Sequence, residues 1–114
     1  MASYVLPLRT DLPAYRFQVE LEGRTYGLRL RWNERAAAWF LSVLTADDAL
    51  LLSGVKVVVG VPLLRRHVDS RLPPGELMAL DTARADAEAG LEELGARVVL
   101  TYTEAADLPE GYRA

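Results

Sequence analysis

The chain has 114 residues, of which 51 % are hydrophobic and 25 % are charged, and its formal net charge is −3. These values suit one folded domain with a modest core, and they exclude both a disordered chain and a strongly basic one that wraps nucleic acid. Cysteine is absent and histidine occurs once, which excludes disulfides and cysteine–zinc sites. No apolar run could span a bilayer and the first residues lack a signal-peptide layout, so we expect a cytosolic chain without a targeting segment.

Alternation of apolar and polar residues predicts strands in the first half of the chain. Residues 16–22 alternate up to Gly23, and residues 25–32 repeat the pattern. Together they predict a hairpin with one apolar face and one charged face. Residues 38–44 predict a third strand, and the two aspartates at 47–48 predict the turn that follows it.

The second half predicts further strands with less regular alternation. Residues 50–61 are apolar on both faces apart from Ser53 and Lys56, which indicates either a strand buried on both sides or a strand bent at its glycines to cross between sheets. Pro62 then marks an edge or a bend, because proline cannot donate to a ladder. Residues 76–80 and 97–103 predict two more short strands.

One stretch predicts a helix, near residues 86–94. Asp86 can cap its start, Leu91 and Leu94 share one face, and Gly95 ends it. A polar C-terminal tail follows from about residue 104. The predicted fold class is therefore mainly β: a single domain over residues 1–114, built as a small β-barrel or sandwich of six to seven short antiparallel strands with one short helix.

The chain offers no convincing set of residues for catalysis, cofactor binding or metal binding. His67 lacks partner ligands, and its proximity to Ser70 and Asp69 in one loop is not the geometry of a catalytic triad. The aspartates at 47–48 are explained by their turn, and no phosphate-binding glycine motif occurs. We therefore predict that the protein is not an enzyme and uses no cofactor.

Charge is divided unevenly along the chain. Residues 9–35 carry six arginines against four acids, residues 36–80 balance four against four, and residues 81–114 carry three arginines against eight acids. This division is compatible with a solvated mixed surface, or with oppositely charged ends that attract each other or neighbouring chains. Arginine is enriched at protein interfaces. The candidate partner-interface residues are Arg29, Arg31, Arg35, Arg65 and Arg66.

The predicted hairpin separates its aromatic and basic side chains. Tyr26 and Trp32 share the apolar face, whereas Arg29 and Arg31 take the other. A nucleic-acid-binding sheet needs both kinds on one face, so this separation favours a core with a charged outer face. The two tryptophans remain open to both interpretations, as interface residues or as ordinary core.

Several short segments follow one another in a fixed order over about residues 4–102. They are Tyr4-Val5-Leu6-Pro7-Leu8, the run from Tyr26 to Arg35, Trp39-Phe40-Leu41, Gly60-Val61-Pro62-Leu63-Leu64, Pro74-Gly75-Glu76-Leu77, Asp81, and Leu94-Gly95-Ala96-Arg97-Val98. Together these segments resemble the baseplate plug family of contractile-tailed phages, of the cyanophage type.

The resemblance implies a structural virion protein of the tail baseplate. It implies contacts with hub, central spike and tail-tube proteins, several copies per particle, synthesis in the host cytoplasm, and help in closing the tube end before contraction. It implies no catalytic residues, no membrane contact and no specific nucleic acid. The alternative from the residues alone is a free-standing small β-barrel that binds nucleic acid or a small ligand.

Overall fold

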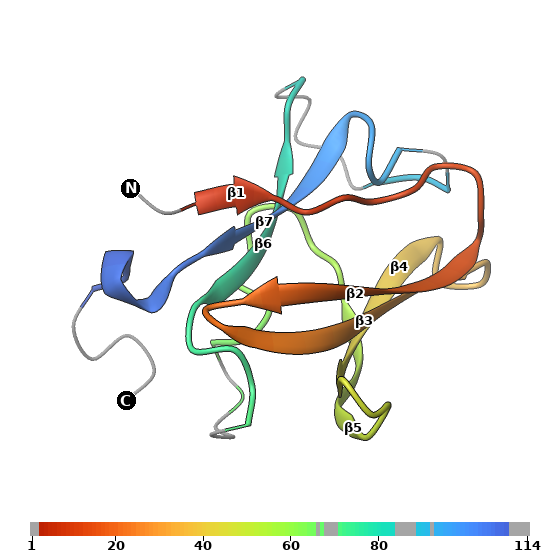
Figure 1. The fold of residues 1–114 in the computed structure, drawn as a ribbon. Coiled ribbons are helices and arrows are strands. Elements are labelled where there is room, and N and C mark those ends of the chain that lie inside the picture. The colour runs from red at the N-terminus through yellow and green to blue at the C-terminus, as the bar shows by residue number, and fades with distance from the viewer. Residues whose placement is uncertain (1–2, 66, 68–70, 84–88, 92, 110–114) are drawn as a thin grey trace.

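The computed structural model describes residues 3–65, 67, 71–83, 89–91 and 93–109. They form seven strands in two antiparallel sheets, one of four strands in the order β2-β3-β4-β5 and one of three in the order β1-β7-β6 (Figure 1). The strands are β1 (Ser3–Val5), β2 (Ala14–Leu21), β3 (Arg24–Asn33), β4 (Ala38–Thr45), β5 (Leu50–Lys56), β6 (Glu76–Asp81) and β7 (Val98–Thr103). The predicted class, mainly β with six to seven short strands, is confirmed.

The β2–β3 hairpin forms as the alternation predicted. Its two turn residues, Glu22 and Gly23, both have positive φ angles, of 53° and 82°. Two such residues make the tight turn whose twist matches that of paired strands. The pairing of Phe17 with Leu28 and of Arg16 with Arg29 places apolar side chains on the inner face and charged ones on the outer face.

The apolar stretch after β4 crosses from one sheet to the other. β5 ends at Lys56, and Val59 forms a parallel bridge with Ala79 of β6 in the second sheet. Gly54 and Gly60 both have positive φ angles, of 64° and 77°, a backbone conformation that glycine adopts without steric cost. Of the two predicted alternatives, the strand bent at its glycines is therefore the correct one.

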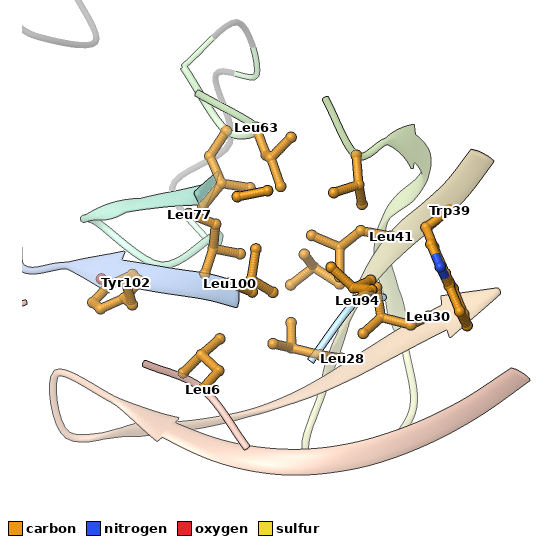
Figure 2. Close-up of a cluster of buried hydrophobic side chains, with 14 of the residues drawn as sticks. Leu6, Leu28, Leu30, Trp39, Leu41, Leu63, Leu77, Leu94, Leu100 and Tyr102 are labelled. Atoms are coloured by element: carbon orange, nitrogen blue, oxygen red, sulfur yellow. The ribbon is translucent and has the colours of Figure 1, made fainter. Parts of the chain in front are cut away.

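The core lies between the two sheets. Figure 2 shows leucines of β3 and β4 meeting side chains of β6 and β7, with Leu6, Leu63 and Leu94 adding to them from the connecting segments. The large side chains of Trp39, Tyr26 and Tyr102 are at most 1 % exposed. Burial of this continuous apolar set, at roughly 25 cal/mol per Å² removed from water, is the main stabilising contribution.

The predicted helix near residues 86–94 is not found in the part of that range that the structure describes. Residues 89 and 90 have no regular structure, 91 and 93 lie in turns, and Leu94 forms an isolated bridge, while 86–88 and 92 lie outside the described residues. Side-chain hydrogen bonding explains the turn: Glu93 accepts the amide of Gly90 at 2.8 Å and the Nε of Arg97 at 2.8 Å. The Arg97 guanidinium lowers the pKa of Glu93. The one helical element described is a 3₁₀ turn, η1 (Ala105–Asp107).

A hydrogen-bonded junction joins the hairpin turn to the second sheet. The buried hydroxyl of Tyr102 donates to Glu22 Oε2 at 2.5 Å and accepts the amide of Gly75 at 2.7 Å. The same carboxylate oxygen accepts the amide of Ala105 at 3.2 Å, at the start of η1. Burial, and secondarily the bond to Glu22, raises the pKa of Tyr102. This junction ties the β2–β3 end of the four-stranded sheet to the second sheet.

Candidate partner-binding surface

The outer face of the four-stranded sheet carries a concentration of positive charge. The side chains of Arg29 and Arg31 are exposed on the outer face of β3. The alternating residues Leu28, Leu30 and Trp32 point inward and are buried or partly buried. Arg16 of β2 lies directly opposite Arg29. Lys56 of β5 lies on the same face, opposite Phe40 of β4. The sequence predicted the two β3 arginines as partner-interface residues, and the register places them side by side with further cations.

These cations differ in whether they form an ion pair within the chain. Arg16 forms an ion pair with Asp48 in the β4–β5 turn. Arg29, Arg31 and Lys56 have no ion pair or side-chain hydrogen bond within the described part of the chain. Arg29 and Arg31 lie two positions apart on the same face of β3, where like charges repel, and the fold gains no ion-pair stabilisation from these three cations. We call Arg29, Arg31, Lys56 and the Phe40 between them the basic face.

Phe40 was not among the predicted interface residues. The register pairs it with Arg31 on one side and with Lys56 on the other, and its side chain is partly buried. Sequence alternation in residues 38–44 contained this signal, because Trp39, Leu41 and Val43 point inward and Phe40 therefore points outward. An aromatic side chain of β4 thus lies between cations on the outer face. Within the β2–β3 hairpin, Tyr26 and Trp32 are separated from Arg29 and Arg31 as the sequence predicted.

Arg35 lies at one end of this face, in the turn between β3 and β4. Together with Arg31 and Phe40 it lines a shallow hollow of about 390 Å³. The neighbouring carboxylate of Glu34 accepts the indole Nε1 of Trp32 at 2.7 Å, so it is engaged within the turn. Arg35 itself has no ion pair or hydrogen bond to any described residue.

The remaining predicted arginines do not belong to the basic face. Arg65 is exposed in the loop that leads to β6, and it is already engaged by other groups of the chain. Arg66 lies outside the described residues. The structure thus joins Arg29, Arg31 and Arg35 along one end of the sheet and places Arg65 in a separate loop.

The two tryptophans serve the core. Trp39 is 1 % exposed, and its indole donates to the carbonyl of Gly90 at 3.0 Å. Trp32 packs edge-on against it with ring centroids 5.7 Å apart. The interpretation of Trp39 as ordinary core is therefore correct.

Two further kinds of site were sought among the described residues. They contain no group of three or more histidine, aspartate or glutamate side chains that could hold a metal ion. They also contain no helix long and apolar enough to cross a membrane. His67, the single histidine, lies partly buried in the loop before β6, where its backbone amide donates to the carbonyl of Leu64.

Comparison with models of known protein families gives a match. A family model described as "Cyanophage baseplate Pam3 plug gp18" matches residues 3–105, a range that runs from the first strand to the first residue of η1. No curated protein matches the chain. Because the family match includes both sheets and the basic face, the chain belongs to the cyanophage baseplate plug family.

Proposed function

We propose that this protein is a plug subunit that packs against hub, central spike and tail-tube proteins in the middle of the baseplate. There it helps to close the end of the tail tube before the sheath contracts. It acts through binding and shape, without catalysis, metal or cofactor. It is made in the host cytoplasm, enters the virion during assembly and is present there in several copies.

The observation that carries this proposal is the family match over residues 3–105. Membership assigns the chain a structural place in the tail baseplate, in association with other baseplate components. The fold supports the role, because two sheets packed on one continuous core make a small rigid block. The finer assignments, to the three partner proteins and to tube closure, belong to the proposal.

The direct test is deletion of the gene from the phage or tail-like particle that encodes it. Intact particles imaged by cryo-electron microscopy should show density of this fold at the tube end, and particles from the deletion strain should lack it and lose their tube contents early. Absence of the protein from purified wild-type particles would contradict the proposal. Deletion particles whose tubes stay closed would contradict the closing role alone.

A second candidate function is favoured by one feature, the position of Phe40 between Arg31 and Lys56. An aromatic ring among cations can stack a base while the cations neutralise phosphates. This arrangement supports a small module that binds single-stranded nucleic acid. Salt-dependent retention of the purified chain on single-stranded DNA would support this alternative, and co-purification with spike or tube proteins would support the plug.

A further inference from the structure

We propose that the basic face is a docking surface for an acidic surface on a neighbouring baseplate protein. The inference rests on the proposed function, since it names the chemistry of one of the partners. It is carried by the four residues already defined, Arg29, Arg31, Lys56 and Phe40, and by what the fold does with its other charges.

The first argument is that three cations on one face of the sheet are paired with no acid in the described part of the chain. Several other basic side chains do have such a partner: Arg9 pairs with Asp11, Arg16 with Asp48, and Arg97 with both Asp81 and Glu93. On the basic face, three cations have no such pair within the described residues. Arg29 and Arg31 are neighbours on one face of β3 and repel each other in the free protein, and an acidic partner would offset that repulsion.

The second argument is the layout of the face. Phe40 lies at its centre, with Arg31 beside it on β3 and Lys56 beside it on β5. An apolar centre with a charged rim is the usual anatomy of a protein interface, and arginine and aromatic side chains dominate binding energy there. The hollow of about 390 Å³ lined by Arg31, Arg35 and Phe40 offers room for a partner side chain at the edge of the face.

The third argument is that contacts within the sheet already hold this surface in place. Next to Arg29, the buried side chain of Ser42 accepts the amide of Gly54 at 3.1 Å, so it is occupied within the sheet. Leu44, farther along the same face of β4, is 1 % exposed. A preorganised sheet surface loses little conformational entropy on docking, which favours binding without rearrangement.

Two other occupants agree less well with these observations. A second copy in a two-fold contact would set this face against itself, cation against cation. A strand of nucleic acid would stack its bases on several aromatic rings, whereas Phe40 is the one aromatic side chain on the outer face of the described sheet. An acidic protein surface satisfies the cations and the single aromatic together.

The test reverses single charges and counts the protein in assembled particles. Arg29→Glu, Arg31→Glu and Lys56→Glu are compared with Arg24→Glu, a matched reversal of an exposed arginine beside the hairpin turn. Each gene complements a deletion strain, and copies per particle are counted by quantitative mass spectrometry, with thermal unfolding of each purified variant as a folding control. We expect occupancy to fall about tenfold or more for the three face variants and to stay unchanged for Arg24→Glu. Normal occupancy of the face variants would overturn the proposal.

The outcomes of this experiment distinguish failure of the proposed function from failure of the docking surface. If the wild-type protein itself is absent from particles, the proposed function fails; if it is present and the face variants enter normally, only the docking surface fails. Purified chain is also tested for binding to oligothymidylate and for self-association by sedimentation. If the wild-type chain binds oligothymidylate and both Arg31→Glu and Phe40→Ala lose that binding, the face binds nucleic acid. If the chain self-associates and Arg31→Glu loses that association while Arg24→Glu keeps it, the face binds a second copy. Either result would overturn the proposal.

Discussion

The guanidinium of Arg16 lies over Gly27, where a Cβ atom would come within 3.0 Å of Nη2 of that arginine. Arg16 starts on β2, passes over β3 at this glycine and forms an ion pair with Asp48 beyond the end of β4. Leu44, which the register places opposite Gly27 on the same outer face, is 1 % exposed. The absence of a side chain at Gly27 thus permits an ion pair across the sheet, and that pair neutralises the cation nearest to Arg29.

Gly27→Ala should displace the Arg16 guanidinium and weaken its ion pair with Asp48. Because an exposed pair contributes little, we expect the free energy of unfolding to fall by only about 1 kcal/mol. Urea denaturation measures the change. In an Arg16→Gln background the same substitution should cost nothing or stabilise, since alanine is favoured over glycine in a strand. An equal loss in both backgrounds would show that the arginine is not the cause.

The strand pattern of the first half could be predicted because inner and outer residues alternate without interruption. The prediction of a helix was wrong in the described part of residues 86–94: Asp86 and Gly95 resemble helix caps in the sequence, but Glu93 bonds to Gly90 and Arg97 instead. Local propensity cannot show such side-chain competition.

The basic face was half predicted: Arg29 and Arg31 follow from alternation, whereas Lys56 joins them only through the pairing of β4 with β5. Cross-strand register depends on tertiary structure, and one strand considered alone does not contain it.

Gly75→Ala should be among the most damaging single-methyl additions in this chain. A Cβ atom there would overlap the carbonyl oxygen of Thr103 and come within 2.5 Å of the Tyr102 hydroxyl. The first is a backbone atom and the second belongs to a fully buried side chain, so neither can move aside easily, and we expect a loss of about 3 kcal/mol or more in unfolding free energy. Denaturant unfolding, or loss of soluble protein on expression, measures it.

Gly60→Ala is the matched control for that prediction. Nothing lies within 4 Å of a Cβ atom at Gly60, but its φ angle of 77° is unfavourable for alanine. Backbone strain alone should cost about 1 kcal/mol. If Gly75→Ala costs no more than Gly60→Ala, the close approach of β7 to Gly75 is not a constraint on the fold.

Tyr102→Phe and Tyr26→Phe make a matched pair of hydroxyl deletions in the core. Both side chains are at most 1 % exposed. The Tyr102 hydroxyl joins Gly75 to Glu22, whereas the Tyr26 hydroxyl is buried with no partner within the described structure. Removing the first should cost about 1–3 kcal/mol, because the buried amide of Gly75 loses its acceptor. Removing the second should be neutral or stabilising. Equal effects in calorimetric unfolding would contradict the assigned network.

The stability of the fold should decline in alkali, and Tyr102 should account for much of the slope. Burial raises the pKa of Tyr102 in the folded state, so folding favours its protonated form. The pKa of Tyr102 is higher in the folded state than its unfolded value of 10.0. Its contribution to stability is therefore fully present below about pH 10 and is lost as the pH rises further. Burial also raises the pKa of Tyr4 and Tyr15. We therefore expect unfolding free energy to fall above pH 10 in urea titrations, and to fall less steeply in Tyr102→Phe. An unchanged slope in Tyr102→Phe would refute the assignment.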